Sequence, residues 1–366
     1  MIYFLYYTIV IINILFYTLS RNKKKNNNIL LIISILILGI LFSNDLSNLD
    51  MNNYKILYNA INWNKLSSEI AFDILLIFCK YLGFSLVQIR AVVYILIIIF
   101  FFCGLRKICF NYHLFISIYM LYLFFIDSIQ IKNTIAEAII FFALTFLIDE
   151  ENKAGIKYVF FILLASIFHN AAIFFLVFIL IKIRNKKMLC QTVIFVTLIM
   201  ELIIVLNGKR IPFIGYIIGY LFNESQRANQ YLLTKTNGVY GILLLMILNC
   251  ILMYISYHKV TKYAENVSEI SVIKIGLYSS VIILLYAPLL WLNVEFYRLP
   301  RMLLPLQYCC IINTISMEKM KKYLSKYIIL IIFIFGLFEW FYLSYYSISN
   351  ASQIFEPFFT KSELLK

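Results

Sequence analysis

Long apolar segments recur along the whole chain and are separated by short polar strips. Each segment holds roughly 15–20 mostly apolar residues, close to the length that an α-helix needs to cross the hydrocarbon core of a bilayer. This pattern predicts an all-α, polytopic integral membrane protein, built as a single membrane domain over residues 1–366.

The Lys and Arg residues between the segments indicate how the helices are oriented. Cytoplasmic loops retain Lys and Arg, so we place the strips that begin at Arg21 and Lys319 in the cytoplasm. Threading the chain between such strips predicts about 12 crossings, within a range of roughly 10–14, with both termini outside and external loops at about 43–88 and 207–237. The uninterrupted predicted spans are Ile2–Leu19, Ile29–Phe42, Ile89–Leu105, Tyr112–Ile126, Ile131–Ile148, Leu189–Leu206, Gly238–Tyr257, Val272–Leu292, Arg301–Ser316 and Tyr327–Tyr346.

Two segments depart from this simple pattern. The segment Tyr158–Ile183 is long for one span, and a single crossing would leave Arg184 outside. We therefore expect a broken helix or short hairpin that turns at His169, with its nonhelical backbone buried in protein or wet, because lipid cannot satisfy it. The segment Ile70–Val87 is interrupted by charged residues, and we expect it to lie as an interfacial helix on the outer surface.

Composition and charge narrow the class of protein. Of the residues, 63% are apolar and 14% charged, whereas soluble domains are roughly half apolar and a quarter charged. The net charge of +14 does not indicate a nucleic-acid partner, because the cations lie in strips between spans and no nucleic-acid motif accompanies them. The seven cysteines form no C-x-x-C pattern and His169 has no second ligand at a metal-binding spacing. We expect no metal and no cofactor.

Ionisable residues of both signs collect at the outer membrane surface on this map. A charge that faces lipid costs several kcal/mol, so these residues are expected to line a wet cavity. The cytoplasmic Lys/Arg strips are explained by topology alone. The outer group, which predicts the position of the functional site, consists of Asp45, Asp50, Asp127, Lys132, Glu137, His169, Arg210, Glu224, Arg227, Glu295, Arg298 and Arg301.

The densest polar element runs from Glu295 to Arg301. Glu295 and Arg298 are three residues apart and share a face if the backbone is helical, as do Arg298 and Arg301. Two guanidiniums could bind a diphosphate, because arginine presents planar, bidentate donors to phosphate oxygens. Tyr297 adds a face on which a sugar could stack. The alternative is that the arginines snorkel at the interface with Glu295 as a local partner.

A second polar element opens the apolar segment at residue 131. Asn133 and Glu137 are four residues apart, and Lys132 lies on an adjoining face. In one interpretation these groups pair with each other, and in the other they meet an anionic substrate or a sugar.

Two further candidates stand apart from these elements. His169 is either a packing residue or a group for hydrogen bonding and proton transfer. Asp50 lies four residues before Tyr54, so the two side chains would be neighbours if that loop is helical. Asp50 is a candidate base or an ordinary helix cap, and Tyr54 is a candidate sugar-stacking face.

In their order along the chain, these elements resemble the EpsG family of Wzy-like bacterial membrane proteins, which are implicated in polymerising exopolysaccharide or O-antigen repeat units. The resemblance covers about residues 29–345. Lys132 stands where the family commonly has Arg, which keeps the charge but loses the bidentate fork, and Asn133 replaces Gln. The matching elements are Asp50 with Tyr54, Ile131-Lys132-Asn133, Ala165 to Ala172 around His169, and Arg298 to Arg301.

The resemblance implies a GT-C-like, Wzy-like glycosyltransferase on the outer face of the bacterial cytoplasmic membrane. It would join lipid-linked oligosaccharide repeat units by attack of a sugar hydroxyl on an anomeric carbon, with undecaprenyl diphosphate leaving. Its partners would be the undecaprenyl-diphosphate-linked oligosaccharide and the bilayer, with a chain-length regulator as a candidate. The implied diphosphate and sugar contacts are Lys132, Asn133, Arg298, Arg301, Tyr54 and Tyr297, and the competing bases are Asp50, Glu137, His169 and Glu295.

Two other classes of function remain open at this point. One is a transporter, either a flippase of lipid-linked oligosaccharide or a secondary carrier that uses the broken helix near His169. Transporters often carry paired interrupted helices in repeated halves, and the sequence offers one such break. The other class is another membrane transferase or ligase of the same pathway, or a noncatalytic scaffold.

Overall fold

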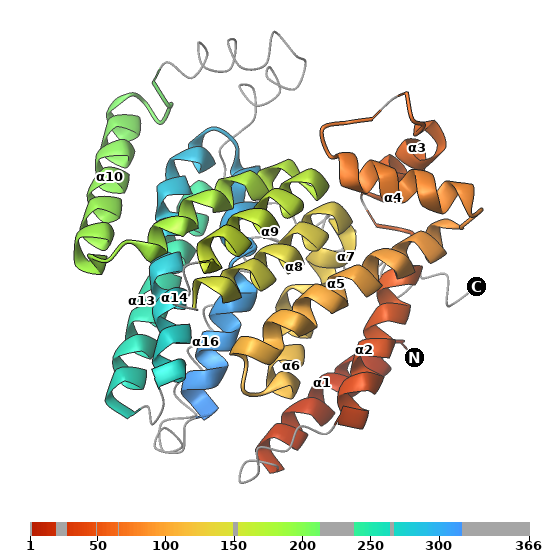
Figure 1. Ribbon diagram of the computed structural model, residues 1–366, viewed down its shortest axis with the longest axis horizontal. Helices are drawn as coiled ribbons and strands as arrows, with labels where there is room; N and C mark the ends of the chain where they lie inside the picture. Colours follow the sequence, from red (N-terminus) through yellow and green to blue (C-terminus); the bar gives the residue numbers. More distant parts are fainter. Residues whose placement is uncertain are drawn as a thin grey trace.

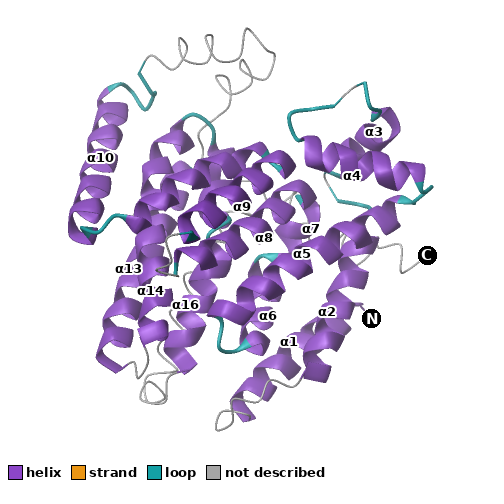
Figure 2. Ribbon diagram, viewed as in Figure 1, coloured by secondary structure: helices purple, strands orange, loops and turns teal. Residues whose placement is uncertain are grey.

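The structure is a computed structural model in which residues 2–19, 28–48, 50–64, 66–148, 153–212, 238–263 and 267–316 are described. These residues form α-helices and 3₁₀-helices (η) and no strand (Figure 2). In chain order the elements are α1 (Ile2–Leu19), α2 (Asn28–Asn44), α3 (Met51–Ala60), α4 (Ile70–Tyr81), α5 (Leu86–Ile108), α6 (Tyr112–Tyr122), α7 (Phe124–Ile129), α8 (Ile131–Leu144), η1 (Thr145–Leu147), α9 (Ala154–Phe168), η2 (Asn170–Lys182), α10 (Lys186–Leu206), α13 (Val239–Tyr263), α14 (Val267–Ile282), η3 (Ile283–Trp291), η4 (Val294–Tyr297), α15 (Arg298–Arg301) and α16 (Leu304–Ser316).

Several of these helices have the length and composition of membrane spans. Four are long and apolar, namely Leu86–Ile108, Lys186–Leu206, Val239–Tyr263 and the continuous stretch Ile270–Trp291, and five shorter apolar helices accompany them in the described part of the chain. The prediction of an all-α, membrane-embedded class is confirmed at this level. The helices do not establish the expected count of about 12, and the predicted last span, Tyr327–Tyr346, lies outside the described residues.

The core of the bundle is built around α8. This helix contacts α5 on one side and α9 on another, and nearly all of its side chains are buried. Small residues allow the close approach: a Cβ added to Gly104 of α5 would lie 2.6 Å from the ring of Phe141 on α8. Helix α16 is also almost entirely buried, and it packs against α13, α14 and α6 (Figure 1). Polar residues near the start of α8 are therefore held in a rigid environment.

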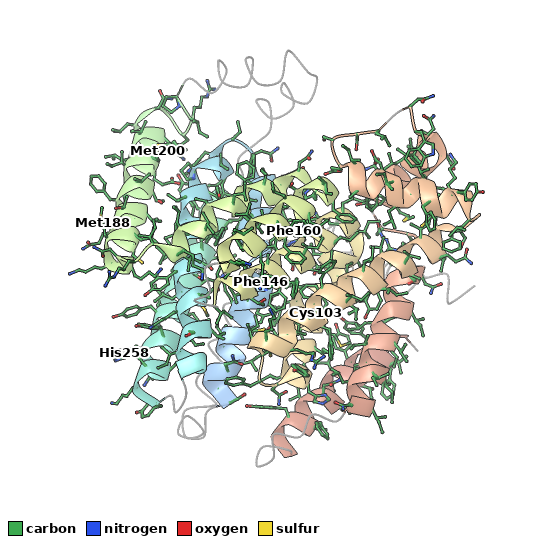
Figure 3. All side chains as sticks on the ribbon, viewed as in Figure 1. Cys103, Phe146, Phe160, Met188, Met200 and His258 are labelled. Carbon is green, nitrogen blue, oxygen red and sulfur yellow. The ribbon has the colours of Figure 1, made fainter. Side chains whose placement is uncertain are left out.

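The outer surface of the bundle is apolar. Figure 3 labels Met188 and Met200 on α10 and Phe160 on α9, and their side chains are 63%, 43% and 60% exposed. Leu206 at the end of α10 is 77% exposed. Soluble proteins rarely expose apolar surface on this scale, so the exposure supports a membrane-embedded protein.

The two ends of the bundle differ in their charges. We call one the basic end, because residues 106–111, 183–186 and 259–263 bring Lys and Arg there. At this end Asn313 of α16 donates to the carbonyl of Ile108 (2.6 Å), and the Lys107 ammonium lies 4.1 Å from the ring centroid of Phe146. We call the opposite end the polar end. It is formed by residues 45–85, 127–132, 168–170 and 293–301 (Figure 1).

The predicted break at His169 is confirmed. Helix α9 ends at Phe168, His169 has an extended backbone (φ −151°, ψ 117°), and η2 then returns along α9. The Tyr158 hydroxyl donates to the carbonyl of Phe175 across this hairpin, and both side chains are fully buried. Protein rather than lipid therefore surrounds the hairpin's inner face, and the turn lies at the polar end.

The expected external loop at 43–88 contains two short helices, α3 and α4, which lie together at the polar end (Figure 1). The interfacial helix expected over 70–87 is shorter than predicted, because Gly83 (φ 70°) turns the chain in the left-handed region, which favours glycine. Ser85 then caps α5 through a reciprocal pair of bonds with Gln88. The cap starts α5 at Leu86, before the predicted Ile89.

Candidate functional site

Three segments far apart in the sequence meet at the carboxylate of Glu69, just before α4. Its Oε2 lies 2.7 Å from Lys132 Nζ in the first turn of α8, and its Oε1 lies 2.6 Å from His169 Nδ1 at the helix break. The neighbouring Asn170 donates to the Ser68 hydroxyl at 2.6 Å. Glu69 thus joins the loop between α3 and α4 to both the central helix and the hairpin.

Glu69 is ionised across the physiological pH range. Partial burial by itself would raise the pKa of Glu69, but hydrogen bonds from His169 and Lys132, together with the charge of Lys132, lower it to about 2. The three side chains remain accessible, since Glu69, His169 and Lys132 are 16%, 17% and 19% exposed.

Asp50 and Tyr54 extend this cluster. The helix expected to bring them together is present, with Asp50 at the N-cap of α3, and the Tyr54 amide donates to the Asp50 carbonyl at 3.1 Å. The Asp50 carboxylate makes no capping bond. Burial raises the pKa of Asp50, the positive charge of Arg298 lowers it, and the negative charge of Glu295 raises it. Asp50 therefore lies within electrostatic range of both residues.

Glu295 and Arg298 form the ion pair expected from their spacing. Glu295 Oε2 lies 3.1 Å from Arg298 Nη2, and the side chains are 46% and 28% exposed. Phe296, between them, packs edge-on against Phe174 of η2 with ring centroids 6.2 Å apart. The pair thus sits against the hairpin that carries His169. We call the accessible group at the polar end the open cluster. It consists of Asp50, Glu69, Lys132, His169, Glu295 and Arg298.

A second group of charges lies completely buried, and we call Asp127, Glu137 and Arg301 the buried cluster. Arg301 Nη2 is 3.7 Å from Asp127 Oδ1, with both side chains 0% exposed. The Tyr119 hydroxyl donates to Asp127 Oδ2 at 2.9 Å. Both carboxylate oxygens of Glu137 are buried and form no hydrogen bond within the described part of the chain.

The structure divides the predicted site residues between two depths. The open cluster holds Asp50, Lys132, His169, Glu295 and Arg298, with the half-buried Tyr54 beside Asp50. The predicted residues that are buried are Asn133, Glu137, Tyr297 and Arg301. The predicted alternative in which Lys132 pairs with Glu137 is wrong, because Lys132 pairs with Glu69 and Glu137 lies in the buried cluster. Arg210 follows α10, whereas Glu224 and Arg227 lie outside the described residues.

Sequence reasoning missed Glu69 and Arg90. Arg90 is 1% exposed, and its Nη2 lies 3.7 Å from Asp45 Oδ2. Its Nε donates to the Phe42 carbonyl and its Nη2 to the Ser128 carbonyl, both at 2.8 Å. A lone arginine near the start of an apolar span was a usable signal, because such a charge requires partners. Glu69 gave no local signal, since its partners are 63 and 100 positions away.

The open cluster combines cationic and acidic groups on a partly accessible surface. Lys132 and Arg298 can neutralise an anionic ligand, and His169 and the carboxylates can accept protons. No group of three or more His, Cys, Asp or Glu side chains that could hold a metal occurs among the described residues. The cluster is therefore suited to bind an anion next to a group that exchanges protons.

Comparison with known proteins gives a family assignment. The model of the EpsG family matches residues 28–356, which is most of the chain. No curated protein and no solved structure shows a significant match. The chain therefore belongs to the EpsG family and is an exopolysaccharide-related membrane protein.

Proposed function

We propose that this EpsG-family protein is a membrane polysaccharide polymerase. It joins oligosaccharide repeat units carried on undecaprenyl diphosphate, on the outer face of the cytoplasmic membrane. The observation that carries the proposal is the open cluster, in which Lys132 and Arg298 lie with acidic groups and His169 at one end of a membrane bundle.

The distribution of charge supports an outward-facing polar end. The opposite end carries the Lys and Arg of residues 106–111, 183–186 and 259–263, and the positive-inside rule favours the cytoplasm for such a basic end. Because the hairpin turns at His169, the strip at Arg184 returns to that same basic end. A site at the polar end therefore meets the headgroups of lipids in the outer leaflet.

The charges of the cluster match the demands of the proposed reaction. When a diphosphate leaves, negative charge develops on its oxygens, and nearby cations stabilise that charge. Arg298 offers a guanidinium for bidentate contact and Lys132 an ammonium. Arg301 is fully buried and is paired with Asp127 instead. The incoming hydroxyl needs a base, and the acidic groups and His169 border the same surface.

The experiment is reconstitution of the purified protein with lipid-linked repeat units, with product length read on a gel. Arg298→Ala should lower the rate of chain lengthening about 100-fold, the loss seen when one preorganised donor to developing negative charge is removed. Arg184→Ala, an exposed arginine at the basic end, is the matched control and should retain activity.

Three outcomes are informative. Normal lengthening by the Arg298→Ala protein would remove the proposed diphosphate contact. Movement of repeat units across the bilayer without lengthening would show a flippase instead. Transfer of a single finished chain to another acceptor would show a ligase of the same pathway.

A further inference from the structure

The contact between Glu69 and His169 has the geometry of a histidine held by a carboxylate. The Nδ1 to Oε1 distance is 2.6 Å. An ionised carboxylate can only accept hydrogen bonds, so Nδ1 must be the donor. In the neutral imidazole the second nitrogen, Nε2, then carries the lone pair and can accept a proton.

His169 is also placed where a substrate can reach it. The ring lies at the turn of a hairpin, on an extended backbone rather than within a helix, and is 17% exposed. Its Nε2 forms no hydrogen bond with the described part of the chain. The other described histidine inside the bundle, His113, is fully buried with its Nδ1 bonded to Asn13.

The competing bases are less well placed. Glu137 is fully buried, and Glu295 is paired with Arg298 at 3.1 Å. Burial raises the pKa of Asp50, the charge of Arg298 opposes that rise, and this arginine belongs to the proposed diphosphate contact. Of the four candidates, His169 combines a partly exposed ring with an Nδ1 that is held by a carboxylate.

We propose that Glu69 is a positioning residue that holds the His169 ring so that Nε2 takes the proton of the attacking sugar hydroxyl. This inference rests on the proposed polymerase function. It adds a residue, Glu69, that sequence motifs did not indicate, and it selects one base among the four candidates.

The proposed transfer accounts for the proton and for the bond that breaks. The hydroxyl proton moves to His169 Nε2, and the hydroxyl oxygen forms a bond to the anomeric carbon of the growing chain. The bond from that carbon to the diphosphate oxygen breaks, and its electron pair leaves with undecaprenyl diphosphate next to Arg298 and Lys132. The imidazolium, stabilised by the Glu69 carboxylate, afterwards returns its proton to water.

Kinetics of variants separate this role from a merely structural one. Glu69→Gln should lower kcat about 100-fold, within the range that acid–base groups contribute, with KM changed by less than about 3-fold. Glu69→Asp should recover part of the loss. Ser68→Ala removes the neighbouring tether between the same loop and the hairpin without touching the carboxylate, and it should keep normal activity.

Double variants test whether Glu69 acts through His169. If it does, Glu69→Gln added to His169→Gln should cause little further loss, because the two residues act as one unit. Glu69→Gln added to Lys132→Met should still cause nearly its full loss. Equal losses for Ser68→Ala and Glu69→Gln, or full additivity with His169→Gln, would overturn the proposal.

A spectroscopic measurement is independent of activity. The chain has three histidines, so ¹⁵N NMR of histidine-labelled protein in nanodiscs can be assigned with the His169→Gln variant. The Nδ1–H tautomer should dominate at His169 and should be lost in Glu69→Gln. A dominant Nε2–H tautomer in the unsubstituted protein would overturn the positioning role. If the tautomer is as expected but repeat units are not lengthened, the polymerase function fails instead, and the assigned proton transfer fails with it.

Discussion

Replacing Arg301 should destabilise the protein far more than replacing Arg298, although the two arginines are three residues apart. Arg301 is 0% exposed and lies 3.7 Å from Asp127. At that separation and an effective dielectric constant of about 20, the attraction between unit charges is roughly 4–5 kcal/mol. Removing one partner of a buried pair costs a similar amount, about 3–5 kcal/mol, because the other charge is left buried.

The variant Arg301→Met keeps apolar volume but leaves Asp127 and Glu137 without the cation that lies beside both. The matched variant Arg298→Met breaks the partly exposed pair with Glu295, and such pairs contribute about 0–1 kcal/mol. Thermal unfolding in one detergent should therefore show a much lower Tm for Arg301→Met than for Arg298→Met. Adding Asp127→Asn to Arg301→Met should recover part of the loss.

The opposite result would refute this reasoning. If Arg301→Met unfolds at the same temperature as Arg298→Met, the buried cluster is not a structural charge group. If that stable variant is also inactive, Arg301 acts on the substrate directly, as the sequence pattern alone predicted.

Three other predictions follow from particular contacts. Folding lowers the pKa of Glu69 from 4.5 to about 2, so its ionised carboxylate should stabilise the folded protein fully above pH 4.5 and lose that effect as the pH falls toward 2. This pKa shift corresponds to roughly 3 kcal/mol of folding free energy. Glu69→Gln should therefore flatten the dependence of Tm on pH between these two values. Gly276→Ala should lower Tm, because its new Cβ would lie 2.4 Å from Cys310 Sγ, and a control Ala substitution at Gly155, whose nearest neighbour is 3.3 Å away, should cost less. In a cysteine-free background, Arg298→Cys should react with a membrane-impermeant thiol reagent added outside, whereas labelling from the cytoplasmic side would reverse the assigned orientation.

Much of the fold could be predicted because lipid imposes a simple rule on the sequence. Apolar length and the placement of Lys and Arg were enough to predict an all-helical membrane protein. The break at His169 followed from segment length and the parity of crossings. The short helices α3 and α4 were harder to predict. An amphipathic segment of about 12 residues is compatible with an external loop and with an interfacial helix equally well.

The site was predicted as a list of residues but not as a geometry. The i, i+3 pairing of Glu295 with Arg298 is local, and it is present at 3.1 Å. The bonds of Glu69 are not local, because they require a loop, a helix start and a hairpin turn to converge. The sequence pattern also did not indicate how deeply each site residue is buried. Lys132 and Asn133 are neighbours in sequence, yet one is accessible and the other buried, because successive residues of a helix point about 100° apart.

The most direct test of the proposed function is to compare the number of new linkages between repeat units with the number of lipid carrier molecules released. Purified protein in proteoliposomes would receive repeat units on undecaprenyl diphosphate, and both chain length and free undecaprenyl diphosphate would be measured over time. The account predicts one undecaprenyl diphosphate released for each new linkage between repeat units, at a rate that falls in Arg298→Ala. Repeat units that cross the membrane or stay single, with no undecaprenyl diphosphate released, would contradict it.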